Sequence, residues 1–392
     1  MATTTPRFVL RGGERWRSPW DDYAALRDHD PVHHVVDADV YVLTRFADVW
    51  NAARDHTTYS SAQGLTMTYG EMEQLDMGGN VPMVFLDPPD HTRFRRTVAK
   101  GFTPRRVSAI EPEIRRFVRE RIDDLADAGT GDIVASVFKP LPSFVVAHYL
   151  GVPDEDRVRF DGWTDAIVAA GAGETVDSAA SAYGELIDYF IELIERRRTD
   201  PADDMISMLV GLGEETVGIM RILGFAFTMV TGGNDTVTGL LSTSAQLLAE
   251  NPDQRRLLID DPSLIANAVE ELLRLSSPAQ NLARTVTTDV ELHGTTIPAG
   301  KKVLLCYAAA NRDEREFGPT ASELDVTRRI DKFVAFSYGT HHCIGAAVAR
   351  LQGRVALEEL LARCPDFEVD AAAGEFANGG YVRRYKSLPF RA

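Results

Sequence analysis

The feature that most constrains the fold is a proline-free segment of 37 residues from Glu214 to Glu250. As one helix it would be about 55 Å long, several times the average helix. It ends at Asn251-Pro252, a pattern that stops helices. Between Ile222 and Val230 apolar residues occupy every side of the predicted helix. The segment therefore predicts a helix that runs through the protein core and not over its surface.

The middle of this predicted helix contains Gly232-Gly233-Asn234-Asp235-Thr236. Each glycine costs about 1 kcal/mol relative to alanine in a helix interior, so the pair needs a reason. One reason is close packing of a neighbouring helix. The other is a flat ligand lying against the glycine backbone, with Asp235 and Thr236 placed for proton transfer. The residues alone leave both readings open.

The remaining pattern is mainly α with small β-sheets. Strands are predicted at Val40 to Leu43 and within residues 285–307, where β-branched residues alternate with polar ones around His293-Gly294. No internal repeat, low-complexity tract or Ser/Gly linker divides the chain, so residues 1–392 are expected to form one domain. Further helices are predicted over residues 112–128, 182–198 and 263–275.

Composition excludes several classes of protein. The net charge of −16 argues against nucleic acid or an anionic membrane as the main partner, because both are themselves anionic. Three cysteines in 392 residues are too few for a disulfide scaffold. The N-terminal sequence lacks the pattern of a signal peptide, and no apolar stretch is long enough to span a membrane. A soluble, cytoplasmic protein is expected.

The strongest motif runs from Phe336 to Gly345 and reads FSYGTHHCIG. An amphipathic helix follows it, so Cys343 is predicted at a helix N-terminus, where free N–H groups favour an anion and lower a thiol's pKa. Gly339 can take the positive φ of a sharp loop, and Gly345 removes a side chain where a bulky group could press on the helix.

Three roles for Cys343 are considered. It could be a small buried apolar residue, a nucleophile beside a histidine as in cysteine hydrolases, or the single protein ligand of a haem. No oxyanion-hole motif accompanies it, and a lone thiolate cannot hold zinc. The pattern FxxGxxxCxG is expected by chance in about one in a thousand chains of this length and composition.

This pattern resembles the haem-binding signature of the cytochrome P450 family, and the resemblance covers nearly the whole chain. Stretches such as SSAQGLTMTYGE and MVTGGNDTVTG are most similar to the actinobacterial family-130 type. The resemblance implies the cytochrome P450 fold, with its long central helix crossing haem b. It also implies a monooxygenase that inserts one atom of O2 into a lipophilic small molecule. A haem-binding sensor or carrier is the alternative, but it would not need Asp235 and Thr236 beside paired glycines.

The resemblance assigns a role to each motif. Cys343 is the metal ligand, and Asp235 and Thr236 are the acid and alcohol of oxygen activation. Glu271, Arg274 and Arg328 form a buried structural network. The other expected haem-binding residues line the cofactor: Gly232 and Gly233 leave room for O2, Phe336, Gly339 and Gly345 shape the cysteine loop, and His91, Arg95, Arg284 and His341 hold the propionates.

Electrons are expected from a separate ferredoxin and its NAD(P)H-dependent reductase, because only 49 residues follow Cys343 and no cluster-binding cysteines are present. A basic segment in this acidic chain is the expected docking face. Methionines and aromatic residues between Ser60 and Phe85, and the run from Ala166 to Gly173, are expected to cover the substrate pocket. The proposed basic residues are Arg93, Arg96, Lys100, Arg105 and Arg106.

Overall fold

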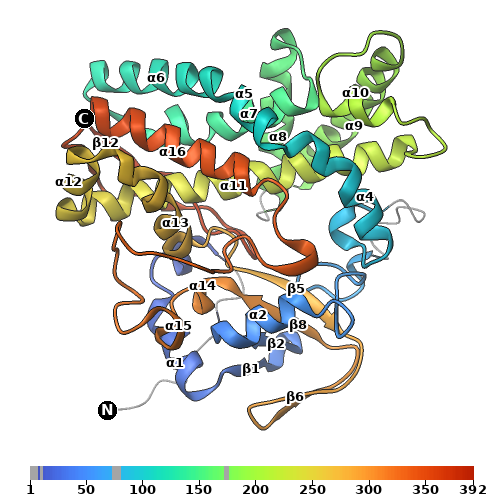
Figure 1. Cartoon of the computed structure of the whole chain (residues 1–392), viewed down its shortest axis with the longest axis vertical. Coiled ribbons are helices and arrows are strands. Elements are labelled where there is room, and N and C mark those ends of the chain that lie inside the picture. The colour runs from blue at the N-terminus through green and yellow to red at the C-terminus, as the bar shows by residue number, and fades with distance from the viewer. Residues whose placement is uncertain (1–7, 9–11, 73–80, 172–175) are drawn as a thin grey trace.

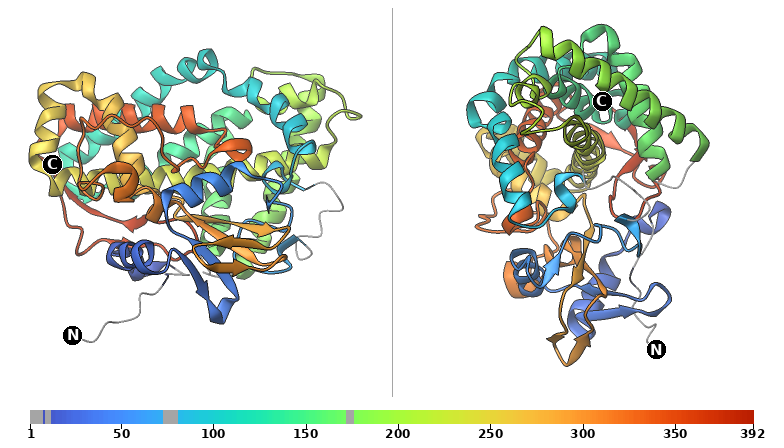
Figure 2. Two further views of the ribbon diagram at one scale, coloured as in Figure 1. Left: turned by 60° about the horizontal axis from the view of Figure 1, so that its bottom comes forward. Right: turned by 90° about the vertical axis from the view of Figure 1, so that its right-hand side faces the viewer.

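The computed structural model describes residues 8, 12–72, 81–171 and 176–392. Figure 1 shows a large helical part and a smaller part built around a sheet, and both views in Figure 2 keep these two parts distinct. The C-terminus lies in the helical part. The described residues contain no helix with the length and apolar character needed to cross a membrane.

The long predicted helix is present as α11 (Ile219–Glu250). It begins five residues later than expected because Gly218 is extended, with φ −67° and ψ 158°, and turns precede it. It ends before Asn251, and α12 (Pro252–Asp260) starts at the following proline, as predicted. Helices α7 (Pro140–Leu150), α13 (Ile265–Ser276) and α16 (Ala346–Arg363) pack against α11. The right-hand view of Figure 2 shows it nearly end-on among these helices.

The other helices surround α11 or flank the sheet. Three of the predicted helices are confirmed, as α6, α9 and α13, with ends shifted by up to six residues. A π-helical turn, Val134–Phe138, leads into α7. The remaining bounds are α1 (Trp20–His29), α2 (Phe46–Arg54), α4 (Asp90–Val98), α5 (Pro104–Ala109), α6 (Glu111–Ala128), α8 (Arg157–Gly171), α9 (Val176–Thr199), α10 (Met205–Val210), α14 (Tyr307–Ala310) and α15 (Glu314–Phe317).

The main sheet has the strand order β1-β2-β8-β5-β3. The predicted strand at Val40–Leu43 is confirmed as β2, and the predicted strand zone supplies β5, β8 and the hairpin β6–β7. Strands β2 and β8 are parallel, with Val42 opposite Leu304, and the other neighbours are antiparallel. The bounds are β1 (Val32–Val35), β3 (Tyr59–Ser60), β5 (Asn281–Val286), β6 (Val290–Leu292), β7 (Thr295–Ile297) and β8 (Lys302–Cys306).

Two small sheets that the sequence did not predict use the C-terminal strands. One has the order β4-β12-β9 and the other pairs β10 with β11. Each strand has only two or three residues, too few for an alternating pattern to be recognised. They are β4 (Thr130–Asp132), β9 (Glu368–Val369), β10 (Glu375–Phe376), β11 (Tyr385–Ser387) and β12 (Pro389–Arg391).

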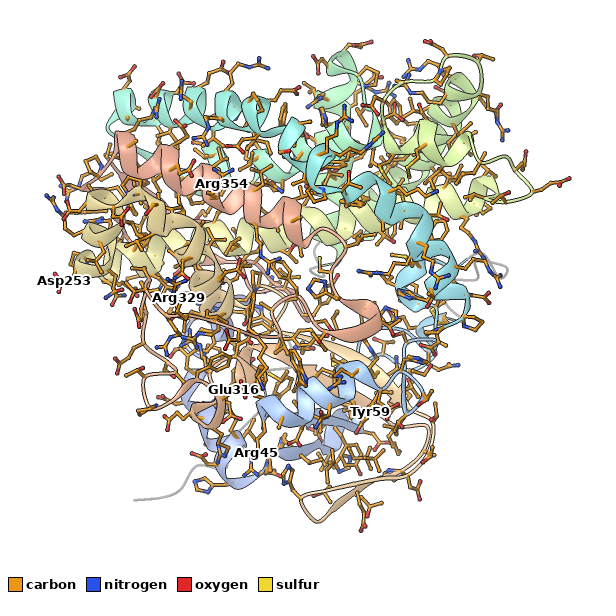
Figure 3. The ribbon with its side chains drawn as sticks, in the orientation of Figure 1. Arg45, Tyr59, Asp253, Glu316, Arg329 and Arg354 are labelled. Atoms are coloured by element: carbon orange, nitrogen blue, oxygen red, sulfur yellow. The ribbon has the colours of Figure 1, made fainter. Side chains whose placement is uncertain are left out.

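Ion pairs fix α16 against α6. Arg354 on α16 lies 2.6 Å from Glu111 and 3.0 Å from Glu358. Arg115 on α6 joins the same two carboxylates, at 2.9 and 2.6 Å. Figure 3 labels Arg354 on α16. Since the four side chains share their partners, the network sets the position of α16 along α6 more firmly than one isolated surface pair would.

Gly239 allows the C-terminal segment to approach α11 closely. A Cβ at this position would lie 2.5 Å from the carbonyl oxygen of Arg383 and 3.1 Å from Cβ of Pro278. By contrast, a Cβ at Gly224 on the same helix would meet Pro82 at an ordinary 3.5 Å. The glycine at 239 therefore has a packing reason, which the glycine at 224 lacks.

We expect Gly239→Ala to destabilise the protein by about 1–3 kcal/mol, because backbone atoms of the C-terminal segment must move to admit the methyl group. Gly224→Ala is the matched control and should be neutral or stabilising by up to about 1 kcal/mol, the gain in helix propensity. Urea unfolding of both variants measures this difference. Equal stability of the two variants would contradict the packing role of Gly239.

Candidate active site

Cys343 lies just before α16, in the loop that carries the FSYGTHHCIG motif. Its backbone N–H donates to the carbonyl of Phe336 at 2.9 Å, which closes the loop. Gly345 is the N-cap of α16, and its backbone N–H points to the Cys343 thiol. Cys343 is exposed, whereas Cys306 and Cys364 are buried. The sulfur is therefore the accessible one of the three and sits where a helix begins, as the motif predicted.

The surroundings of the thiol act in opposite directions on its pKa. Cys343 keeps solvent-exposed surface, yet the protein atoms around its thiol remove part of the hydration of a thiolate and raise the pKa of Cys343, while the Gly345 N–H and the charges of Arg95 and Arg350 lower it. The net direction is upward, so the expectation that the helix N-terminus would lower the pKa of the free thiol is wrong. Burial outweighs the helix end here, and deprotonation would have to come from a coordinating metal, which removes the proton from a thiol.

The loop before Cys343 contains two residues with positive φ. Gly339 has φ +69°, as predicted, and a Cβ there would lie 2.8 Å from the carbonyl oxygen of Ala53 at the end of α2. Ser337 has φ +56°, a conformation that glycine adopts with less strain. Its hydroxyl accepts a hydrogen bond from Tyr307 at 3.2 Å. These contacts place the cysteine loop between α2 and α14.

Four cationic or imidazole side chains converge beside the loop. The rings of His91 and His341 lie 4.3 Å apart, and Ser61 contacts Nε2 of His341 at 3.1 Å. Burial and the charges of Arg95 and Arg284 lower the pKa of His91 to about 4 and that of His341 to about 2. Both histidines are therefore neutral at pH 7 and can donate one N–H each.

This cluster fits an anionic group with two carboxylates. Both ring nitrogens of His91 are buried with no hydrogen-bond partner among the described residues. Arg284 is 3% exposed, and one of its Nη atoms donates only to the carbonyl of the preceding residue, at 2.7 Å. Arg95 donates to the carbonyl of His342 at 2.5 Å. Buried donors without acceptors are costly, so the four side chains suit the propionates of a haem.

The two glycines in the middle of α11 differ in their surroundings. A Cβ at Gly232 would have no atom within 4 Å, while one at Gly233 would lie 2.9 Å from Val146 on α7. The backbone at Gly232 therefore faces open space, whereas the missing side chain of Gly233 allows α7 to pack closely against α11. The two positions differ because adjacent helical residues point about 100° apart, and the expectation that both glycines leave room for O2 stays a prediction.

The polar residues that follow these glycines also have defined contacts. Thr236 Oγ1 donates to the carbonyl of Gly232 at 2.8 Å, so its hydroxyl lies at the open glycine. Asp235 Oδ1 lies 2.6 Å from Nε of Arg384, which precedes β11. The sequence motif predicted Asp235 and Thr236 as a pair. No local pattern indicated that Arg384, far along the chain, would contact Asp235.

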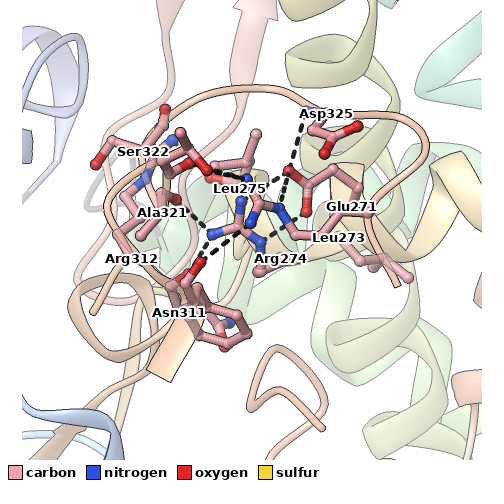
Figure 4. A network of polar contacts seen from close by, with 12 residues as sticks. Glu271, Leu273, Arg274, Leu275, Asn311, Arg312, Ala321, Ser322 and Asp325 are labelled. Carbon is pink, nitrogen blue, oxygen red and sulfur yellow. Dashed lines mark hydrogen bonds and ion pairs between the residues drawn. The ribbon is translucent and has the colours of Figure 1, made fainter. Parts of the chain in front are cut away.

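A buried network lies at the end of α13 (Figure 4). Arg274 donates to both carboxylate oxygens of Glu271 at 2.7 Å, and both side chains are 0% exposed. Arg274 also donates to the carbonyls of Asn311 and Ala321, at 2.6 and 2.5 Å. Arg328 donates to Glu271 at 3.2 Å, so the three residues predicted as a network do contact one another.

Asn311 connects this network to the cysteine loop. Its carbonyl accepts from Arg274, and its Oδ1 accepts from the backbone N–H of Val334 at 2.8 Å. Ser337 N–H then donates to the carbonyl of Val334 at 2.9 Å. Three successive hydrogen bonds thus connect the ion pair to the loop. No local sequence pattern marks the side chain of Asn311 as part of this connection.

Fewer residues of the predicted docking face carry an unpaired positive charge than the sequence suggested. Arg93 pairs with Asp90 at 3.2 Å, and Arg106 pairs with Asp203 at 2.5 Å. Within the described ranges Arg96, Lys100 and Arg105 are exposed and have no carboxylate partner within 4 Å. The unpaired positive charge therefore rests on these three residues, since Asp90 on the same helix pairs with Arg93 and the distant Asp203 pairs with Arg106.

Only part of the two segments that are expected to cover the substrate pocket lies within the described residues. Met77 and residues 172–175 lie outside the described residues. Met83 is 5% exposed and belongs to the main core. The hydroxyl of Tyr69 donates to the carbonyl of Asp39 at 2.7 Å, which ties its segment to the sheet. Met83 and Tyr69 therefore have structural roles.

We expect Glu271→Gln to destabilise the protein by about 3–5 kcal/mol, because it leaves Arg274 buried without its counter-charge. The adjacent Glu270 pairs with Arg350 at 2.6 Å near the surface, so Glu270→Gln should cost less than about 1 kcal/mol. Denaturant unfolding of the two variants tests the contrast. A loss below 1 kcal/mol for Glu271→Gln would contradict the role of the network.

Comparisons with known proteins agree with this geometry. The family described as Cytochrome P450 matches residues 173–373. Cytochrome P450 130 of Mycobacterium tuberculosis is 60% identical, covering 98% of this chain and 97% of its own. Vitamin D(3) 25-hydroxylase of Pseudonocardia autotrophica is 37% identical, covering 99% and 97%. The solved structure of CYP109E1 from Bacillus megaterium in complex with corticosterone has a TM-score of 0.85 at 30% identity, covering 96% and 99%. The chain belongs to the cytochrome P450 family and is a monooxygenase that binds haem b through a cysteine thiolate.

Proposed function

We propose that this protein binds haem b through Cys343 and hydroxylates a lipophilic small molecule with O2, using electrons from a separate ferredoxin. The observation that carries the proposal is the position of Arg95, which donates to the carbonyl of His342, the residue before Cys343, at 2.5 Å. In the same cluster the ring of His91 lies 4.3 Å from that of His341. A single sulfur and a cluster of carboxylate-binding side chains are thus neighbours. When bound, the haem supplies the oxygen chemistry, and thiolate ligation favours O–O cleavage.

The residues of this chain have separate tasks in that scheme. His91, Arg95, Arg284 and His341 would bind the two propionates of the haem and so fix its orientation. Gly232 leaves space beside the helix backbone. Thr236 holds a hydroxyl proton at Oγ1, directed to the Gly232 carbonyl, and can pass that proton into the same space. Asp235 is the next acid on the helix and can replace the proton that Thr236 gives up.

A lipophilic substrate is supported by the wall that α11 presents. Thr228 and Thr231 donate to the carbonyls of Gly224 and Phe227, at 2.7 and 3.0 Å, so their hydroxyls are already satisfied. Between α9 and the first half of α11 lies a small, partly open cavity of about 30 Å³. It is lined by apolar residues and one glycine: Tyr183, Leu186, Ile187, Phe190, Met220, Leu223, Gly224 and Phe227.

The names of the relatives suggest where a substrate search should begin. One relative is a vitamin D(3) 25-hydroxylase, and one structural neighbour was solved with corticosterone. Both ligands are large and lipophilic, in accord with the apolar wall of α11. We therefore propose vitamin D3 and steroids as the first compounds for a substrate-induced spin-state screen.

We expect Thr236→Ala to retain haem and to consume NADH, but to form about tenfold less product per NADH, with the missing reducing equivalents recovered as hydrogen peroxide. A positioned proton donor contributes roughly 10²- to 10⁴-fold, so this loss is at the low end. Product and peroxide are measured together with a converted substrate. Unchanged coupling in Thr236→Ala would remove Thr236 from proton delivery.

A second expectation concerns the redox partner. Arg96→Glu should slow reduction by an acidic ferredoxin by about tenfold or more at low ionic strength, since it reverses charge on the docking face. The difference should shrink at high salt. Arg256→Glu on α12 is the control for charge reversal elsewhere. Stopped-flow reduction rates that respond equally to both variants, or that do not depend on salt, would contradict docking at Arg96.

A further inference from the structure

We infer that Arg384 is a positioning residue for proton delivery, which holds Asp235 ionised and in place beside Thr236. The inference rests on the proposed function, since it concerns the acid that supplies Thr236. Arg384 is 149 residues away from Asp235 along the chain and precedes the short strand β11. Its side chain nevertheless reaches the middle of α11, where Nε lies 2.6 Å from Asp235 Oδ1.

The backbone that carries Arg384 is fixed on both sides. Val382 forms a β-bridge with Ala279, and Arg383 N–H donates to the carbonyl of Pro278 at 2.8 Å. The Arg383 side chain donates to the carbonyl of Trp16 at 2.7 Å and to Oγ1 of Thr243 at 3.1 Å. Arg384 therefore starts from a segment with little freedom to move.

Gly239 determines how near this segment comes to α11. Cβ of Arg384 would be 3.4 Å from a Cβ at position 239. Because Gly239 follows Asp235 by four residues, the two lie on one face of the helix, one turn apart. The guanidinium can therefore reach back along the helix to Asp235. A larger residue at 239 would move the whole segment outward.

The pair is largely enclosed by protein. The side chain of Arg384 is 9% exposed and that of Asp235 is 23% exposed. Taking a guanidinium out of water is costly unless a counter-charge accompanies it, and a positive charge this close favours the ionised carboxyl. Nε of Arg384 has no well-aligned hydrogen bond among the described residues, so charge attraction and not hydrogen-bond geometry holds the two groups together.

Two other titratable groups lie near the pair. Burial, together with the charges of Asp235 and Glu71, raises the pKa of Tyr381, so this phenol is neutral. Glu71 accepts from Thr66 at 2.8 Å and lies 3.8 Å from Lys302. Arg384 is a cation in direct contact with Asp235, while Tyr381 and Glu71 belong to the same electrostatic environment.

The pair can move one proton without any net change in either residue. The Asp235 carboxylate takes a proton from water on its accessible side, and Arg384 then faces a neutral acid and holds it less strongly. Because adjacent residues on a helix point about 100° apart, the acid passes the proton through water to Oγ1 of Thr236, and the Thr236 hydroxyl proton leaves into the pocket. Asp235 returns to the carboxylate and to Arg384. No electrons are transferred in these steps.

The test compares Arg384→Gln, which removes the charge, with Arg384→Lys, which retains it. Arg391→Gln is the control, because Arg391 lies in the same C-terminal region and pairs with Glu368 at the surface. Asp235 protonation is read from the carbonyl band of its acid form, in infrared pH-difference spectra of each protein minus its Asp235→Asn counterpart. This readout requires no turnover.

We expect Arg384→Gln to raise the titration midpoint of Asp235 by about one pH unit or more, and Arg384→Lys to return it toward the wild-type value. One unit is about a tenfold change in the ratio of carboxylate to acid. Product per NADH should fall several-fold in Arg384→Gln, with a larger solvent deuterium isotope effect. Arg391→Gln should change none of these quantities.

An unchanged midpoint in Arg384→Gln, no restoration by lysine, or an equal shift in Arg391→Gln would overturn the inference. If Arg384→Gln does not fold, the infrared titration of the wild-type protein tests the inference instead. Asp235 in the wild type should titrate below the ordinary aspartate value of about 3.9. A wild-type midpoint above that value contradicts the inference. Failure of the proposed function would appear instead as unchanged coupling in Thr236→Ala, whatever the titration of Asp235.

Discussion

The placement of one solvent-accessible sulfur at the amino end of α16 is the constraint on which the other features depend. The protein atoms around the Cys343 thiol raise its pKa, despite the Gly345 N–H and two nearby arginines. A thiol in that position is poorly suited to be a free nucleophile and well suited to a metal that removes its proton. Two sets of ion pairs then fix the position of that sulfur. They are the pairs between α6 and α16 and the buried Glu271–Arg274 pair.

The second organising element is α11, which two distant parts of the chain approach closely at glycines. Gly233 leaves room for α7, and Gly239 leaves room for the C-terminal segment, whereas Gly232 faces open space. The two adjacent glycines of the sequence motif therefore differ in their surroundings. At Gly233 and Gly239 the cost in helix propensity is offset by close packing that a Cβ would prevent.

Local patterns predicted the elements and motifs whose signals lie within a few residues. The strand Val40–Leu43, the stop at Asn251 and the positive φ of Gly339 follow from local sequence. What local patterns could not supply was pairing across the chain. Arg384 meets Asp235, Asn311 supports Val334, and Asp203 neutralises Arg106 only because the fold brings them together. The direction of the Cys343 pKa was misjudged for the same reason, since burial is a property of the whole fold.

The central claim is that sulfur of Cys343 is the protein ligand of the haem iron. The most direct measurement is the absorption spectrum of the reduced, carbon-monoxide-bound protein, recorded for the wild type and for Cys343→Ser. The account predicts the spectrum of a thiolate-ligated haem in the wild type and its loss in the serine variant. A nitrogen-ligated spectrum in the wild type, or a thiolate spectrum that survives in Cys343→Ser, would contradict it.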